Sequence, residues 1–425
     1  HENKKLCILN KDDAKIDSPL SQATITTQQV AAVVVPAAVI SLQAVSPSSS
    51  TGITVILLIK MFQYIRYLDI KYPANLVHIF SKTPTESVSL ISGPLFPEFL
   101  KGLVVSYTSP AVFSRYGVSG LFIVNFWKTI ITVVLLSPLV YLLFRIVQRD
   151  LVQNKTLKDL AQKGFQFVFW NFAITFFFSN LDLLSFSSLV EISNLRPGAL
   201  PAFSFLVNVC ILVICFRVMR FIYRKIEELW ALSKEKSWAE IQQENKPYEV
   251  LIRDFNEEFF YQKSFLLIFN SRIIIKNIAI VLYSDSPLFQ ITVLMALNAG
   301  MIYYIGINKP LKKELKTMEL LGYEGILLVG NSLVFILALL DAFELEVSGF
   351  RNFLGSIIIF CNLSLYVCAI GFTVWQTQDK IKKFLEEKKK SITKESDQSE
   401  NVQVNLSETL LDSSVQEQKG QENFE

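Results

Sequence analysis

Seven apolar runs, each long enough to cross a membrane, constrain this chain more than any other feature. They lie at residues 117–146, 165–188, 199–218, 264–284, 286–307, 322–342 and 351–375. About 20 apolar residues in an α-helix span the roughly 30 Å of hydrocarbon in a bilayer. The 425 residues are 51% hydrophobic and only 19% charged, and 34 of them are phenylalanine. The sequence therefore predicts an all-α, polytopic transmembrane bundle whose main partner is the lipid bilayer.

Two weaker apolar segments precede these runs and leave the number of spans open. Residues 23–45 are rich in small and β-branched residues, while 53–70 are more apolar but contain Lys60 and Arg66. If both segments cross, the bundle has nine helices and the N-terminus lies outside. If 53–70 lies on the membrane surface, the bundle has eight helices and both termini lie inside. We favour nine, which requires Lys60 and Arg66 to snorkel toward the headgroups or to find partners.

Positive charge alternates between the loops and predicts the topology. Of the 41 Lys and Arg residues, 26 fall in four stretches, namely 145–164, 216–263, 308–321 and the tail from residue 376. The three alternate loops contain only Arg196. Basic residues concentrate on the cytoplasmic side of membrane proteins, so the four basic stretches and the C-terminus are predicted to be cytosolic. The segment 71–116 then lies outside.

These assignments divide the chain into three parts. Residues 1–21 are an extracellular or lumenal stub, 22–376 form the polytopic transmembrane domain, and 377–425 are a charged tail. The Ser/Gln/Glu-rich composition of the tail predicts disorder. Within the membrane domain we expect an outer cap at 71–116 and a cytosolic helical hairpin at 219–263, broken at Lys246-Pro247.

Cysteine and histidine are too sparse for a metal centre. The chain has five Cys, two His and no CxxC pair, so a zinc or haem site has no ligand set. Cys7 has polar neighbours and is a candidate for a disulfide to an upstream region, which we expect because the chain starts without methionine. Phosphate-binding glycine loops and the common hydrolase and kinase signatures are missing. We therefore expect no enzyme activity, no cofactor and, at a net charge of +3, no nucleic-acid partner.

Asp182 stands in the otherwise apolar stretch WNFAITFFFSNLDLLSF, residues 170–186. A carboxylate at the centre of a membrane helix costs about 2.5 to 3.5 kcal/mol unless it has a partner or reaches water. Lys128 lies at a similar depth on the preceding, antiparallel helix, with Asn125 and Asn180 a turn or less away. We predict a Lys128–Asp182 pair, which either clamps two helices or lines a polar pathway. Alternatively the two groups do not meet, and Asp182 reaches the outer headgroups.

A second polar group, Arg272 and Lys276, lies in the stretch SRIIIKNIAI. The two residues are four apart and therefore face the same way on a helix near mid-membrane. No carboxylate is close to them in the same helix. They could meet carboxylates from the inner hairpin, attract lipid phosphate, or line a cavity open to anions.

Several short motifs occur in a recognisable order. After Cys7 and the first apolar segment come a Gln-aromatic-aliphatic stretch, MFQYIRYLDI, and a tyrosine-proline step, Lys71-Tyr72-Pro73. Further on, YYIGINKPLKKELKTMELLGYEGILL joins a helix, a proline, a basic linker and a glutamate-bearing helix. This order is similar to that of the multi-pass C-terminal membrane region of large ciliate-type cysteine-rich surface proteins, which in turn are distantly similar to the TRP-like channel superfamily.

The resemblance implies a function class. It favours a non-enzymatic multi-pass membrane domain of a larger surface protein in the plasma membrane, which anchors or signals from an ectodomain. The alternatives are a TRP-like cation channel subunit and a secondary transporter. The chain lacks an arginine at every third position of a helix and a filter motif such as TVGYG, both of which a voltage-gated channel would show. A homo-oligomer or a larger membrane assembly is the expected partner state.

Overall fold

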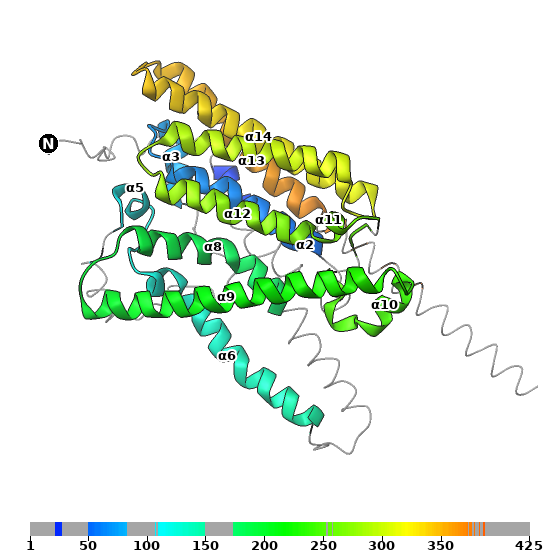
Figure 1. The fold of residues 1–425 in the computed structure, drawn as a ribbon. Helices are drawn as coiled ribbons and strands as arrows, with labels where there is room; N and C mark the ends of the chain where they lie inside the picture. Colours follow the sequence, from blue (N-terminus) through cyan, green and yellow to red (C-terminus); the bar gives the residue numbers. More distant parts are fainter. Residues whose placement is uncertain are drawn as a thin grey trace, which may run out of the picture. The chain divides into compact units, whose positions relative to one another are not determined.

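The computed structural model describes residues 22–27, 50–82, 107, 109–148, 173–251, 254–256 and 258–372, and positions 374, 375, 378, 382 and 386. Every regular element within them is a helix, and no strand is formed there. The elements are α2 (Ser50–Gln63), η2 (Tyr64–Tyr67), α3 (Ala74–Lys82), α5 (Ala111–Ser114), α6 (Phe122–Gln148), α8 (Ala173–Ser193), α9 (Ala199–Leu232), α10 (Trp238–Glu244), η4 (Lys246–Leu251), α11 (Phe260–Lys263), α12 (Phe265–Leu282), α13 (Pro287–Asn308) and α14 (Glu314–Ala342) (Figure 1). A further helix covers Ser348–Phe372.

Seven of these helices are long and apolar enough to cross a membrane. They are Phe122–Leu142 within α6, then α8, α9, α12, α13, α14 and Ser348–Phe372. Each of these seven overlaps one of the seven apolar runs, so the predicted all-α architecture and the seven long apolar helices are confirmed. Several boundaries differ: α14 begins at Glu314, α8 ends at Ser193, and α9 continues to Leu232 without a break, into the segment predicted as the start of the hairpin.

The seven helices are not equally buried. In the apolar windows of α8 and α12, 72% and 67% of the residues are buried inside the protein, against 18% in α6 and 22% in α9. Large apolar side chains of the outer pair, such as Val134 and Phe216, are exposed. A helix that is apolar on all sides suits a bilayer, where the outward face meets lipid instead of water. Helices α8 and α12 therefore form the centre of the bundle.

The segment predicted at 53–70 forms α2 and η2, which pack inside the bundle against α8 and α14. Leu57, Leu58 and Phe62 of α2 are fully or almost fully buried. The close approach to α14 depends on Gly330, since a Cβ there would lie 2.4 Å from the Phe62 ring. Helix α2 therefore packs between other helices of the bundle.

At one end of the bundle, the residues after η4 pair with the loop between α13 and α14. Phe255 and Leu311 form an isolated antiparallel bridge, in which Asn256 N donates to Pro310 O at 2.8 Å and Lys312 N donates to Asp254 O at 3.0 Å. The side chain of Lys263 lies over the Trp238 ring at 3.7 Å. Two of the basic stretches predicted to share one side of the membrane thus lie together.

At the other end, the segment after η2 meets the end of α14 and the start of the last helix. The backbone N–H of Lys71 donates to Asp341 at 2.5 Å, and Arg351 binds the Lys71 carbonyl at 3.0 Å and the Asp341 carboxylate at 2.6 Å. Asn75 of α3 donates to Ser356 at 3.2 Å. The two segments predicted to lie outside therefore pack against each other.

The chain clusters into two compact units, residues 1–370 and 371–425, and the labelled helices belong to the first. In the first part of the chain, the structure describes only 22–27 before α2, so the stub at 1–21 and most of the apolar segment 23–45 lie outside the described residues. Much of the outer cap, from 83 to 106, and nearly all of the tail also lie outside them. The segment predicted as a two-helix hairpin contains the end of α9, then α10, η4 and α11, and η4 begins at Lys246 and runs through Pro247, where a break was predicted.

Candidate functional site

Asp182 lies in the middle of α8, and its ion-pair partner is Lys276 of α12. The Nζ atom of Lys276 lies 2.8 Å from Oδ1 of Asp182, and both side chains are fully buried. The same Nζ atom lies 3.4 Å from the centroid of the Tyr64 ring, a cation–π contact. A charge in the bilayer interior needs a partner of opposite sign, so the pairing accounts for two of the intramembrane charges.

Three helices meet at this pair. Asn277 of α12 donates from Nδ2 to Oδ1 of Asp182 at 3.0 Å, to the Asp182 carbonyl at 2.9 Å and to Oγ of Ser185 at 2.7 Å. From α2, Lys60 donates to the carbonyl of Ser179 at 2.8 Å. We call Lys60, Asp182, Ser185, Lys276 and Asn277 the Asp182 cluster. It links α2, α8 and α12 at the centre of an otherwise apolar bundle.

The prediction that Asp182 pairs with Lys128 is wrong. Lys128 is half-buried on α6, whereas the ion pair of Asp182 is with Lys276. The prediction paired helices that follow each other in the chain, but α8 packs most extensively against α12. These two helices run in the same direction, since Asp182 meets Lys276 while Ser185, further along α8, meets Asn277.

The two asparagines expected beside the pair make bonds of their own. Asn125 binds the backbone before α6, accepting from Ser119 N at 2.9 Å and donating to Ser119 O at 2.8 Å. Asn180 accepts from Thr129 of α6 at 3.3 Å and donates to the Phe176 carbonyl at 2.8 Å. Asn180 therefore ties α6 to α8, and Asn125 fixes the start of α6.

Arg272, one turn before Lys276 on α12, forms a second buried ion pair with Glu324 of α14. The guanidinium donates to both carboxylate oxygens of Glu324, and NH2 also donates to Oδ1 of Asn298 on α13. Arg272 is 4% exposed and Glu324 is fully buried. The cations on α12 thus take their carboxylates from two spanning helices, α14 and α8, and not from the inner hairpin, which was one of the expected sources.

Arg66 also finds partners inside the protein. Its Nε donates to the Gln63 carbonyl at 2.9 Å and NH1 to the Phe80 carbonyl at 3.3 Å. The guanidinium lies 5.8 Å from the centroids of the Phe80 and Tyr116 rings. Burial raises the pKa of the Tyr116 phenol, so this ring stays neutral beside the cation. Lys60 and Arg66 therefore need no snorkelling to be accommodated.

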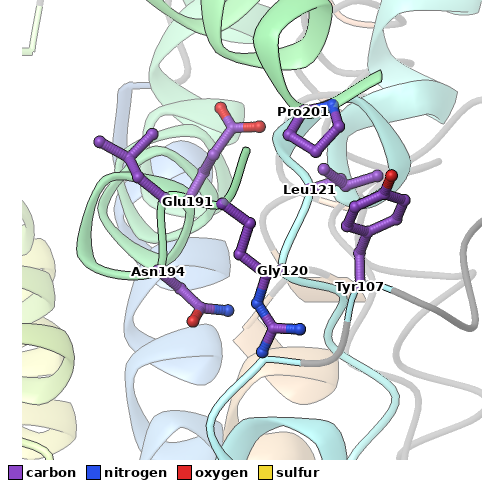
Figure 2. Close-up of a pocket in the computed structure, with 8 residues that line it drawn as sticks. Tyr107, Gly120, Leu121, Glu191, Asn194 and Pro201 are labelled. Carbon is purple, nitrogen blue, oxygen red and sulfur yellow. The ribbon is translucent and has the colours of Figure 1, made fainter. Parts of the chain in front are cut away.

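Glu191 is a buried carboxylate that the sequence prediction missed. Its Oε1 accepts from the backbone N–H of Phe122, at the start of α6, at 3.1 Å, and its Oε2 accepts from Nδ2 of Asn208 on α9 at 2.9 Å. Negative charge at a helix N-terminus is favourable. Figure 2 shows Glu191 and Asn194 on one side of an adjoining pocket, with Tyr107, Leu121 and Pro201 on the other.

The pocket beside Glu191 is too small for an organic ligand. Its volume of about 10 Å³ is close to the minimum that one water needs. Glu191 is three quarters of a turn from the end of the apolar run predicted at 165–188, so the expected helix stopped just short of it. The carboxylate therefore links α8 to α6 and α9 through its two hydrogen bonds.

Some buried polar atoms in and near the Asp182 cluster have no hydrogen-bond partner in the described part of the chain. They are Oδ2 of Asp182, Oδ1 of Asn277, and the hydroxyls of Ser187 and Ser188. All of them lie on α8 and α12, the two most buried spans. Most buried polar groups in proteins are hydrogen-bonded, so these atoms mark the part of the interior best suited to accept a proton or a small polar guest.

Metal-binding residues do not gather in the described part of the chain. No group of three or more His, Cys, Asp or Glu side chains there could hold a metal ion. Cys210, Cys215, Cys361 and Cys368 are free thiols. Cys7, the candidate for a disulfide to an upstream region, lies outside the described residues.

The fold and the buried ion pairs define the class: an all-helical protein with seven candidate membrane spans and a charge-paired interior. Searches against protein-family models, curated proteins and solved structures find no match to this chain.

Proposed function

We propose that this chain is a non-enzymatic multi-pass membrane domain that anchors, or signals from, the ectodomain of a larger surface protein. The observation that supports it best is the pairing of the buried charges. Asp182 with Lys276, and Arg272 with Glu324, neutralise each other inside the bundle. Neither the pocket beside Glu191 nor the groove described below is lined by Asp182 or Lys276. An interior whose charges are paired suits a domain that holds helices together more than one that passes a solute.

The proposed arrangement in the membrane has nine spans. Helix α2 and η2 together cover 18 residues and are about 29 Å long, which matches the hydrocarbon thickness. They supply the eighth span, and 23–45 supplies the ninth. The basic loops, the hairpin and the C-terminus lie in the cytosol, and the protein resides in the plasma membrane, alone or as a homo-oligomer.

A channel or transporter is the second candidate, and one observation favours it. The unpartnered atoms of Asp182, Ser187 and Ser188 follow one another along α8. Intramembrane carboxylates with nearby polar atoms are typical of proton and cation pathways. In that case the Lys276–Asp182 pair would open during transport and expose the carboxylate to water.

Water access to the Asp182 cluster separates the two candidates. Ser185→Cys, in a background without native cysteines, places a thiol beside Asn277, and Ser193→Cys places one at the exposed end of the same helix. We expect a membrane-impermeant thiosulfonate to label the Ser193→Cys protein but not the Ser185→Cys protein in liposomes. The same liposomes should show no cation flux above that of empty vesicles.

The opposite result would overturn the proposal. Labelling of Ser185→Cys at a rate near that of Ser193→Cys means that water reaches the cluster. Cation flux that is abolished by Asp182→Asn would then assign the chain to channels or transporters.

A further inference from the structure

A groove opens where α9, α11, α12 and α13 meet. Its volume is about 590 Å³. It is lined by Tyr223, Phe260, Tyr261, Ser264, Leu267, Ile268, Ser271, Arg272, Ile275, Ala296, Leu297, Gly300, Met301 and Tyr304. Gly300 leaves open space in its wall, because a Cβ at this position would meet nothing within 4 Å.

The groove has the length and polarity of a lipid chain site. From Ser264 to Ile275 it follows 11 residues of α12, about 16 Å of helix, which is close to the thickness of one leaflet. Its walls are mostly aliphatic and aromatic side chains. Ligand sites of this kind are typically apolar, with a few polar groups that fix orientation.

One of the side chains that line the groove is charged and buried. Arg272 lines it and is 4% exposed, and its Nε has no hydrogen-bond partner in the described residues. The NH1 and NH2 groups of Arg272 are held by Glu324 and Asn298, so the guanidinium is fixed with this one donor unsatisfied. An ester oxygen of a lipid is an acceptor of the kind that such a donor binds.

Helix α9, which contributes Tyr223 to the groove, also has a row of exposed cations. Tyr223 lines the groove and packs against Phe260 of α11, with ring centroids 6.2 Å apart. Arg217, Arg220 and Arg224 are exposed on α9 and form no ion pair within the described chain. Their spacing of three and four places them on one face; Arg220 lies one turn before Tyr223, and Arg224 follows Tyr223 in the chain. Exposed basic residues close to a membrane attract anionic headgroups.

We propose that this groove binds one anionic phospholipid from the leaflet next to α11. One acyl chain lies between α12 and α13, and the phosphate is held by Arg220 and Arg224. This proposal goes beyond the proposed function, since either an anchoring domain or a channel could carry such a site. Two surfaces that meet in one site, one apolar and one cationic, select an anionic lipid over a zwitterionic one.

The test uses the full chain in phosphatidylcholine nanodiscs that contain a minor fraction of phosphatidylserine with a diazirine in its acyl chain. After photolysis, mass spectrometry should locate the cross-links on residues 264–275 and 296–304. Gly300→Phe fills the groove and should reduce this labelling at least about tenfold. Gly306→Phe, in the same helix, also enters open space but does not line the groove, so it should leave labelling unchanged. Ala296→Phe is the second filling variant if Gly300→Phe does not fold.

The preference for an anionic headgroup is tested by a separate measurement. The double variant Arg220→Gln/Arg224→Gln should lower the preference for phosphatidylserine over a phosphatidylcholine probe by about tenfold or more. Equal labelling with both probes in the wild-type chain would contradict an anionic site. Cross-links spread evenly over all exposed helices, or lost equally in Gly306→Phe, would show only bulk lipid contact. If the groove is not labelled and the protein has the mass of a dimer, a second copy of the chain occupies the groove, and the proposal is wrong.

Discussion

Breaking the Asp182–Lys276 pair from one side should destabilise the protein far more than removing both charges together. Asp182→Asn keeps the shape of the side chain and an oxygen that can accept from Asn277, but it leaves the Lys276 ammonium without a counter-charge. Lys276→Met removes the ammonium and leaves the carboxylate. The double variant retains the Asn277 contact and contains neither charge.

The magnitudes follow from burial. Both groups are fully buried, and loss of one partner of such a pair costs about 3–5 kcal/mol. Replacement of a whole buried pair by neutral groups of similar size is often neutral. Independent losses would sum to about 6–10 kcal/mol in the double variant, but we expect it to lie within about 2 kcal/mol of the wild type.

The free energy of unfolding can be measured in bicelles by steric trapping, with each single variant, the double variant and the wild type compared. The control is Glu228→Gln, which breaks the Lys225–Glu228 pair on α9, where Glu228 is 57% exposed. Such a pair contributes at most about 1 kcal/mol. The reasoning is refuted if Asp182→Asn costs no more than Glu228→Gln, or if the two single losses add in the double variant.

Packing and hydrogen bonding give two more predictions. Gly330→Ala should lower stability by about 1–3 kcal/mol, because its Cβ would lie 2.4 Å from the Phe62 ring. Gly322→Ala on the same helix meets nothing within 4 Å, so its melting temperature should not fall, and equal melting of both variants would contradict the packing argument. Glu191→Gln should cost about 1–3 kcal/mol, since an amide can accept through only one of the two atoms that now bind the start of α6 and Asn208. An unchanged melting temperature would show that these two hydrogen bonds do not contribute to stability.

The places of seven long apolar helices could be predicted because length and hydropathy are properties of one segment alone. The positions of the basic residues also predicted that two loops lie on the same side of the bundle. Residues 254–256 and 309–312 pair with each other, as two loops on one side of a bundle can. The need of Asp182 for a partner also followed from the cost of a lone charge in hydrocarbon.

The identity of that partner could not be predicted, because it depends on which face of each helix points inward. A surface helix of a soluble protein shows this by an apolar stripe, whereas α8 and α12 are apolar nearly all round. Sequence order favoured Lys128, the nearest cation on the preceding helix. Packing of α8 against α12, 94 residues apart at the ion pair, decided otherwise. Glu324 was not predicted as the partner of Arg272 for the same reason, because the sequence does not show which face of α14 points inward.

The two ion pairs also fix the position of α12 along its neighbouring helices, which apolar contacts alone would not define. Arg272 and Lys276 are one turn apart and bind carboxylates on different helices, Glu324 of α14 and Asp182 of α8. Sliding α12 by one turn, about 5.4 Å, would keep most apolar contacts but bring Lys276 to Glu324. Arg272 and Asp182 would then be buried without partners, at about 3–5 kcal/mol each. We infer that the charges are retained in the membrane interior because they exclude this alternative packing.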